Sequence, residues 1–195
     1  MKTDIVLAGV GGQGILSIAT VIADACLRNG LYVKQAEVHG MSQRGGDVQS
    51  NLRISDRPIA SDLIPLGGAD LIVSLEPMEA LRYLPYLSKD GYIVANSTPV
   101  VNVTNYPDVE GLIDELNATG HAVVFDMEAV AKEVASPRSS NMVLLGAASP
   151  FVGIEAELLE KAIANIFARK GEKIVEMNLA AFRRGREIAK DVVKL

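Results

Sequence analysis

Residues 5–16 read Ile-Val-Leu-Ala-Gly-Val-Gly-Gly-Gln-Gly-Ile-Leu, and this stretch decides the fold that the sequence predicts. It opens with an apolar run typical of a buried strand and continues into an apolar segment of helical length. Between the two, Gly9, Gly11 and Gly14 stand at the G-x-G-x-x-G spacing of a phosphate-binding turn. Amide groups at the start of such a helix are free to face an anion. The stretch therefore predicts a Rossmann-like α/β fold with a phosphate-bearing ligand, whose identity the pattern leaves open.

Each glycine of this turn has an expected role. Gly9 allows a tight turn, Gly11 lets a ligand approach the backbone, and Gly14 lets the helix pack closely on the strand. Gly12 and Gln13 lie between the second and third glycines. We therefore include both of them in the candidate binding site.

Apolar runs alternate with segments of helical character along the rest of the chain. The expected strands are Asp4–Ala8, Asp70–Leu75, Tyr92–Ala95 and Ala122–Phe125. The expected helices are Gln13–Asn29, Pro77–Leu87, Val109–Ala118, Glu128–Ala135, Ser140–Ala148, Glu155–Ala168 and Glu172–Lys194. This alternation predicts a mostly parallel sheet with helices on both faces. From Glu155 onwards only helical segments follow, which predicts a C-terminal helical cap on one face.

Two further segments are expected to form strands near one edge of the sheet. Residues 32–38 alternate imperfectly between apolar and polar, whereas residues 48–54 alternate cleanly, with Val48, Ser50, Leu52 and Ile54 on one face. Strands buried on both faces read as continuous apolar runs, and these two do not. Their polar sides should therefore face solvent, a ligand or a partner.

Length and charge limit the class of protein. With 195 residues the chain is long enough for one buried core and short for two, so residues 1–195 are expected to form a single domain. A net charge of −5 provides no basic field for nucleic acid. No apolar run reaches the length of a membrane span, and the N-terminal residues lack the apolar core of a signal peptide. We expect a cytoplasmic protein that binds neither nucleic acid nor membrane.

The cysteine and histidine counts limit the cofactors. The single cysteine, Cys26, excludes an internal disulfide and a four-cysteine iron–sulfur cluster held by this chain alone. The two histidines, His39 and His121, are too few for a His-rich metal site. We expect no metal site here, so any redox metal must come from another chain. Cys26 is expected to be a buried, inert thiol.

Glu37 lies near the end of the second expected strand. In dinucleotide-binding folds, an acidic residue about 20 residues after the glycine turn binds the ribose hydroxyls. Glu37 lies slightly further than this from Gly14. It could contact a ribose or a basic group of a partner, or it could be a solvated carboxylate on an edge strand, and the residues leave these alternatives open.

Residues 39–47 read His-Gly-Met-Ser-Gln-Arg-Gly-Gly-Asp and form the second unusual segment. Gly40, Gly45 and Gly46 permit backbone conformations and close approaches that other residues resist. Arg44 offers a planar fork of donors that suits phosphate or carboxylate, beside amides that can form an anion nest. We expect a ligand-binding loop. The alternative is a flexible turn whose arginine pairs with an acid.

His39 and Met41 are uncommon in turns, which favours a function for this loop. His39 could shuttle protons, but no serine or cysteine nucleophile accompanies it, and a histidine bonded to the loop backbone is favoured. Arg53, on the polar face of the next strand, could extend the same basic surface.

Asn141 is a further candidate site residue. It follows two serines that can cap the apolar helix, so its side chain could cap that helix or reach a ligand. Asp126 and Glu128 are explained by a helix N-terminus better than by a catalytic pair. No catalytic residue is assigned.

Together these segments resemble a known family. Gly-Val-Gly-Gly-Gln-Gly at 9–14, Glu-Val-His-Gly-Met-Ser-Gln-Arg-Gly-Gly at 37–46, the strand at 48–54 and the segment 141–146 are similar to the gamma-type domain of the 2-oxoacid:ferredoxin oxidoreductases. The similarity extends from Asp4 to about Leu195.

The resemblance implies a subunit that is inactive alone. The complex would decarboxylate an aryl 2-oxoacid with thiamine diphosphate, pass electrons through iron–sulfur clusters to ferredoxin and transfer the acyl group to coenzyme A. This chain lacks the Gly-Asp-Gly segment followed by an Asn-Asn pair that holds thiamine diphosphate through magnesium. Thiamine diphosphate, magnesium and the clusters are therefore expected on a larger alpha subunit. For residues 9–14 and Arg44 the resemblance implies either a contact with coenzyme A or a role in the subunit interface.

Two other functions stay open at this point. The glycine turn and Glu37 are also compatible with a free-standing NAD(P)- or FAD-binding oxidoreductase. The second open function is a module that binds coenzyme A or a nucleotide and catalyses no reaction. The isolated chain could also form a homodimer.

Overall fold

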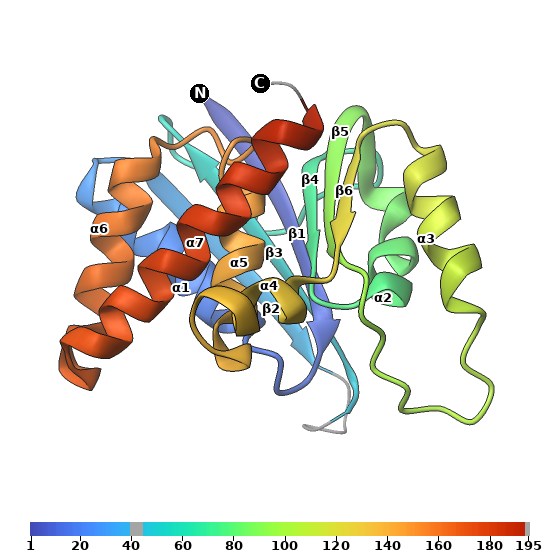
Figure 1. The fold of residues 1–195 in the computed structure, drawn as a ribbon. Coiled ribbons are helices and arrows are strands. Elements are labelled where there is room, and N and C mark those ends of the chain that lie inside the picture. The colour runs from blue at the N-terminus through green and yellow to red at the C-terminus, as the bar shows by residue number, and fades with distance from the viewer. Residues whose placement is uncertain (40–44, 194–195) are drawn as a thin grey trace.

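The computed structural model describes residues 1–39 and 45–193, which form a six-stranded sheet with helices on both faces (Figure 1). The strands are β1 (Lys2–Val10), β2 (Tyr32–His39), β3 (Asp47–Ser55), β4 (Ala69–Ser74), β5 (Leu87–Asn96) and β6 (Ala122–Phe125). Their order across the sheet is β2-β3-β1-β4-β5-β6. The helices are α1 (Ile15–Arg28), α2 (Pro77–Arg82), α3 (Val109–Ala118), α4 (Met127–Val134), α5 (Ser140–Ala148), α6 (Ala156–Phe167) and α7 (Glu172–Val193), with short 3-10 turns η1 (Leu84–Tyr86), η2 (Pro137–Ser139) and η3 (Ala168–Lys170).

The sheet is mostly parallel, as the sequence predicts. β1, β4, β5 and β6 pair in parallel, whereas β3 pairs antiparallel with both β1 and β2. The residues 48–54 lie in β3, beside the edge strand β2, so the predicted edge region is confirmed. Val48, Ser50, Leu52 and Ile54 are all buried on one face, as expected. Asn51 on the polar face is buried as well and accepts a hydrogen bond from the amide of Ile64, so this face is not open along its whole length.

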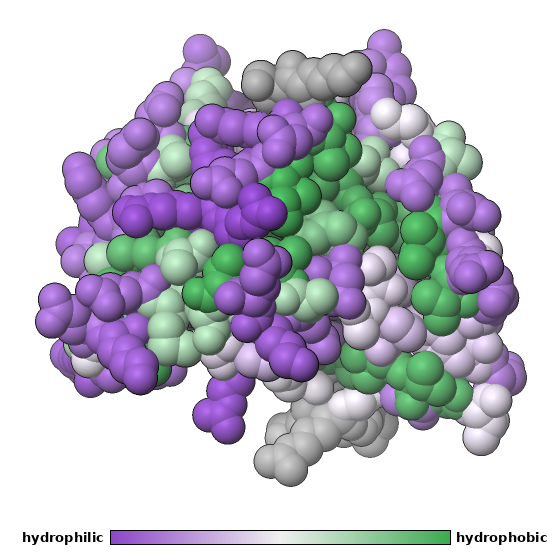
Figure 2. Space-filling model, viewed as in Figure 1, coloured by the Kyte–Doolittle hydropathy of each residue, from purple (hydrophilic) through white to green (hydrophobic). Residues whose placement is uncertain are grey.

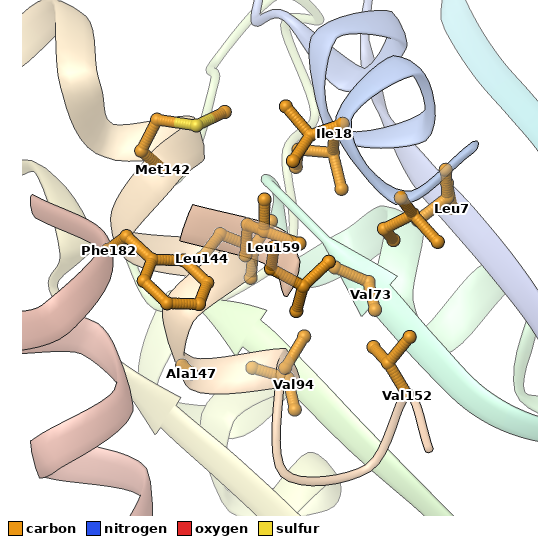
Figure 3. Close-up of a cluster of buried hydrophobic side chains, with 14 of the residues drawn as sticks. Leu7, Ile18, Val73, Val94, Met142, Leu144, Ala147, Val152, Leu159 and Phe182 are labelled. Atoms are coloured by element: carbon orange, nitrogen blue, oxygen red, sulfur yellow. The ribbon is translucent and has the colours of Figure 1, made fainter. Parts of the chain in front are cut away.

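The main core lies between the sheet and the layer formed by α1, α4, α5, α6 and α7. Here Leu7 of β1 and Val73 of β4 meet Ile18 of α1, Leu159 of α6 and Phe182 of α7 (Figure 3). Because α6 and α7 complete this layer, the predicted C-terminal helical cap is confirmed (Figure 1).

A smaller core lies on the opposite face of the sheet. Val6 of β1, Ile72 of β4 and Ile93 of β5 pack there against Ala80 of α2 and Leu116 of α3. Neighbouring residues of a strand point to opposite faces, so β1 contributes Val6 to one core and Leu7 to the other. The parallel strands are therefore covered on both sides, which explains their continuous apolar sequences.

One predicted helix is shorter in the structure. The segment Pro77–Leu87 forms α2 only as far as Arg82, followed by the turn η1, and β5 already begins at Leu87. Pro85 has no amide hydrogen and disfavours a helical conformation at the preceding residue, so a regular helix cannot continue through it. The expected strand Tyr92–Ala95 is correspondingly only the second half of β5.

Helices α5 and α7 approach each other backbone to backbone. A Cβ atom added to Gly146 would lie 1.9 Å from the carbonyl oxygen of Phe182, and one added to Gly185 would lie 2.0 Å from that of Val143. Only residues without a side chain fit at these two positions. The pair of glycines therefore sets the distance between α5 and α7.

Candidate functional site

The glycine turn lies where open α/β sheets bind ligands. The chain leaves β1 through α1 towards β2 on one side of the sheet, and leaves β4 through α2 towards β5 on the other. The crevice between the carboxyl ends of β1 and β4 is thus the point where the strand order reverses. Ligands of this fold class bind at such a point.

The glycines of the turn differ in conformation and in what their missing side chains make room for. Gly9 is still part of β1, and the positive φ angles belong to Gly12, at 103°, and Gly14, at 92°. A Cβ atom on Gly9 would lie 2.9 Å from Oε1 of Gln13. Gly9 therefore leaves room for the Gln13 side chain, which agrees with the expectation that Gly9 allows a tight turn, although the positive φ angles lie further along, at Gly12 and Gly14.

Gln13 braces the crevice. Its Oε1 accepts a hydrogen bond from the amide of Val10 at 2.7 Å, and its Nε2 donates to the carbonyl oxygen of Leu75 at 2.9 Å. The side chain thus links the end of β1 to the residue after β4. Gln13 has a structural role that its position in the motif did not reveal.

Asn141 comes to the turn from the first turn of α5. Its Nδ2 lies 3.5 Å from the carbonyl oxygen of Gly14, and a Cβ atom on Gly14 would lie 2.9 Å from that nitrogen. The missing side chain of Gly14 therefore makes room for Asn141. The expected reason for this glycine was instead close packing of the helix on the strand. The structure places Asn141 beside the glycine motif, far from it in sequence.

A polar cleft of about 320 Å3 opens beside the turn. It is lined by Gly12, Gly14, Asn96, Glu128, Arg138 and Asn141 among others. Asn96 and Arg138 were missed in the sequence. Asn96 follows directly after an expected strand, and this position could have indicated it, whereas Arg138 lies in a turn with no recognisable pattern.

An apolar pocket of about 280 Å3 lies on another side of the same turn. Its walls come from Val10, Ile15, Leu16 and Val48, and Leu16 is exposed. The turn therefore has both polar and apolar surfaces next to it. Such a combination suits a ligand with a charged group and an apolar arm.

The second glycine-rich segment reaches the first. The amide of Gly11 donates to the carbonyl oxygen of Gly46 at 2.9 Å. Gly45, in turn, accepts a hydrogen bond at its carbonyl oxygen from Nδ2 of Asn102 at 2.5 Å. Two motifs that are separate in sequence thus form one edge of the site, together with the loop that follows β5.

Some predicted site residues cannot be placed in the same detail. Gly40, Met41 and Arg44 lie outside the described residues. The backbone of His39 pairs with Val48 at the end of β2, and its side chain is likewise outside the description.

Glu37 is separated from the glycine turn by a whole strand. It lies on β2 opposite Ser50 of β3, and β3 stands between β2 and β1. Two strand spacings amount to about 9–10 Å. In dinucleotide-binding folds the acidic residue is on the strand next to the turn. The strand order therefore disfavours a ribose contact by Glu37 and, with it, the free-standing dinucleotide-binding alternative.

Arg53 does not extend a basic surface at this site. Its guanidinium donates to both carboxylate oxygens of Asp4, at 2.8 and 2.9 Å, near the opposite end of β1. Burial alone would raise the pKa of Asp4, but the hydrogen bonds from Arg53 and Lys2 hold it below its usual value. The prediction for Arg53 was wrong because antiparallel pairing places it opposite a buried acid.

Two buried carboxylates follow β4. Glu76 is fully buried, caps α2 by accepting from the amide of Glu79 at 2.8 Å, and also accepts from the Tyr106 hydroxyl. Glu79 binds Arg82 at 2.7 Å, and burial raises the pKa of Glu79. Glu76 therefore attaches the loop between β5 and α3 to the start of α2.

The described residues contain no group of three or more His, Cys, Asp or Glu side chains that could hold a metal ion. Cys26 is fully buried, and burial raises the pKa of its thiol to about 12. Its burial is as predicted. The donor set of the described residues therefore does not fit an iron–sulfur cluster, and we derive no electron-transfer step within this part of the chain.

The sequence matches a family model described as pyruvate ferredoxin/flavodoxin oxidoreductase over residues 4–188. The chain belongs to this family. The resemblance drawn from its glycine motifs is thereby confirmed, and the chain is a subunit of an oxidoreductase of the 2-oxoacid:ferredoxin type.

Relatives of nearly the same length are named as subunits. Indolepyruvate oxidoreductase subunit IorB of Archaeoglobus fulgidus is 38% identical over 95% of this chain and 94% of its own length. The subunit of the same name from Pyrococcus horikoshii is 37% identical over 98% of each chain.

Solved structures share the fold. The 2-oxoglutarate:ferredoxin oxidoreductase of Magnetococcus marinus, solved with 2-oxoglutarate, coenzyme A and succinyl-CoA bound, matches 97% of this chain with a TM-score of 0.76 and 28% identity. This chain covers 31% of that protein, which is much longer. The gamma subunit of a keto/oxoacid ferredoxin oxidoreductase from Geobacter sulfurreducens matches 97% of this chain and 99% of its own, with a TM-score of 0.71 and 27% identity.

Among the described residues, no helix has both the length and the apolar character needed to cross a bilayer.

Proposed function

We propose that this chain is the small subunit of an indolepyruvate:ferredoxin oxidoreductase, which converts an aryl 2-oxoacid to its acyl-coenzyme A with release of carbon dioxide. The full-length similarity to two subunits of that name carries the proposal. The electrons from the substrate would pass to ferredoxin within a cytoplasmic complex. The companion is a larger alpha subunit that holds thiamine diphosphate, magnesium and iron–sulfur clusters.

The residue inventory supports this division between subunits. A cluster held by protein thiolates needs several cysteines, and this chain has one, which is buried. The described residues also offer no group of carboxylate or imidazole ligands for a metal. What the chain does offer is a glycine turn, a polar cleft and an apolar pocket at the carboxyl edge of its sheet.

We assign coenzyme A contact to this edge. The residues are Gly11, Gly12, Gly14, Gly45, Gly46 and Asn141, with His39, Gly40, Met41 and Arg44 retained from the sequence. Gly9 and Gln13 shape the turn, and Glu37 lies a strand away, so these three are left out. The polar and apolar surfaces beside the turn match a molecule with phosphates and a thiol-bearing arm, and the Magnetococcus relative was solved with coenzyme A. Bracing of the interface with the alpha subunit is the competing role for the same residues.

The complex provides the first test. The chain should co-purify with the product of a neighbouring gene that carries thiamine and clusters, and the pair should reduce ferredoxin with indolepyruvate and coenzyme A. The isolated chain should give no turnover with the same substrates. A chain that never joins such a subunit, or that turns over substrate alone, would contradict the proposal.

The role of the edge is tested by Asn141→Ala. Asn141 lines the cleft, so its loss should raise KM for coenzyme A while KM for indolepyruvate stays unchanged. Asn117→Ala, an exposed asparagine at the end of α3, is the matched control. Arg44→Ala separates the alternatives: an assembled complex with weak coenzyme A binding supports ligand contact, whereas failure to assemble supports the interface.

A further inference from the structure

A third cavity is lined by residues of α1, η2, α5, the end of α6, η3 and α7. Its volume is about 410 Å3, within the range of roughly 300–1,000 Å3 typical of small-molecule sites. Arg138 and Asn141 line both this cavity and the cleft beside the glycine turn. The cavity is therefore a neighbour of the proposed coenzyme A edge, with a lining that is mostly its own.

The charged residues that line this cavity are positive, whereas the chain as a whole is negatively charged. Its lining includes Arg138 and Lys170 and no acidic residue, although the chain has a net charge of −5. Neither cation forms an ion pair with any described residue. The ammonium of Lys170 lies 5.2 Å from the ring centroid of Phe167, a cation–π contact that holds it at the cavity. Two uncompensated cations facing one space favour an anionic occupant.

A serine hydroxyl also lines this space. Ser139 lines the cavity and is only 4% exposed, and its side chain has no hydrogen-bond partner in the described part of the chain. Asn178 is 6% exposed and donates from Nδ2 to the carbonyl oxygen of Ile174 at 2.7 Å, which leaves its Oδ1 as an acceptor. Neither oxygen is among the buried atoms without a partner, so both are open to the cavity and can contact a polar occupant.

The remaining wall is apolar and comes from Phe167, Ile174 and Met177. A free inorganic anion would leave this wall without a partner. An anion attached to an organic body would instead cover it and remove apolar surface from water.

We propose that this cavity binds an organic phosphate monoester. Arg138 and Lys170 bind the phosphate, the Ser139 hydroxyl donates to one of its oxygens, and the organic body lies against Phe167, Ile174 and Met177. The guanidinium fork suits phosphate oxygens, and the lysine adds a point charge. This site goes beyond the proposed function and does not rest on it.

Calorimetric titration of the full chain with AMP tests the proposal, because AMP combines a phosphate monoester with a hydroxyl-bearing organic body. AMP should bind more tightly than inorganic phosphate, and adenosine, which lacks the phosphate, should give no measurable binding. Equal binding of AMP and adenosine, or no binding of AMP at millimolar concentration, would overturn the proposal.

Variants locate the site. Arg138→Gln and Lys170→Gln should each weaken AMP binding about tenfold, as expected for loss of a charge-assisted contact. Ser139→Ala should weaken it less, because the lost donor is neutral. Lys161→Gln is the control, since it removes the same charge from an exposed position on α6 outside the cavity. Both cations are exposed, so the variants should keep the melting temperature of the parent chain. Lys170 lines only this cavity, whereas Arg138 also lines the cleft beside the glycine turn. Affinity that falls in Arg138→Gln but not in Lys170→Gln, or that falls equally in the control, would therefore place AMP elsewhere.

Discussion

Asp4 is only 1% exposed, yet its carboxylate is charged. It accepts two hydrogen bonds from the guanidinium of Arg53 and forms an ion pair with Lys2. Its pKa in the folded chain is lower than its ordinary value. A carboxyl whose folded pKa is depressed stabilises the fold above its unfolded pKa, near 4, and this contribution is lost as the pH falls through the folded pKa. The pair therefore contributes stability at neutral pH that acid removes.

Replacement of Arg53 by glutamine should expose this dependence. The change leaves a buried carboxylate with a weaker partner, which we expect to lower the free energy of unfolding by about 3 kcal/mol at pH 7. The acid-unfolding midpoint should move to higher pH, because the pKa of Asp4 rises. Urea unfolding at several pH values measures both effects.

The matched control is Arg28→Gln, which removes an exposed i,i+4 pair with Asp24. It should lower the free energy of unfolding by no more than about 0.5 kcal/mol. Equal losses in the two variants would contradict the role of burial.

Cys26 gives a second prediction at the residue scale. Since it is fully buried and its thiol pKa is raised to about 12, the folded chain should resist alkylation by iodoacetamide at pH 8. In denaturing urea the same thiol should react completely. Mass spectrometry of the labelled chain measures both. Rapid labelling of the folded chain would show that this face of α1 is not packed in the larger core.

At the scale of the elements, the contact between α5 and α7 depends on Gly146 and Gly185. Gly146→Ala should lower the free energy of unfolding by about 3 kcal/mol or more, because its Cβ would overlap the backbone of α7 and force the helices apart. Thermal and urea unfolding measure the loss.

The matched control for this helix contact is Gly111→Ala on α3. Its added Cβ would come no closer than 3.4 Å to Asp108 Oδ2, an ordinary contact. Alanine is favoured over glycine in helices by up to about 1 kcal/mol, so this variant should be neutral or slightly more stable. If both substitutions had the same effect, the close approach of α5 and α7 would not be what stabilises this layer.

At the scale of the whole molecule, both cores share one sheet, so neither can form without it. β1 supplies Leu7 to the larger core and Val6 to the smaller. We expect residues 1–195 to unfold as one cooperative unit. The tyrosines of both faces, Tyr83 in the smaller core and Tyr92 beside the larger one, should lose their near-ultraviolet signal in the same transition that exposes Cys26. Two separate transitions in urea would contradict a single domain.

The molecule also presents apolar surface near the proposed site. Val101 and Val103 are exposed on the loop that follows β5, and Figure 2 shows hydrophobic residues over this part of the molecule, at the lower right. The same loop binds Gly45 through Asn102. Assembly with the alpha subunit would give this apolar surface a partner, which agrees with the proposed role as a subunit.

Much of the fold could be predicted from local pattern alone. Apolar runs, helical periodicity and the glycine turn at 9–14 identify strands and helices, since each depends on neighbours within a few residues. The glycine motifs also identified the family. Helix boundaries were less certain, as at Pro85.

Only the tertiary structure decided how the elements meet. The insertion of β3 between β1 and β2, which removes Glu37 from the turn, depends on pairing between distant strands. The approach of Asn141 to Gly14 and the pairing of Arg53 with Asp4 likewise join residues far apart in sequence. Periodicity encodes which face of an element is buried. It does not encode which strand or side chain lies opposite, because that choice depends on burial and hydrogen bonding summed over the whole fold.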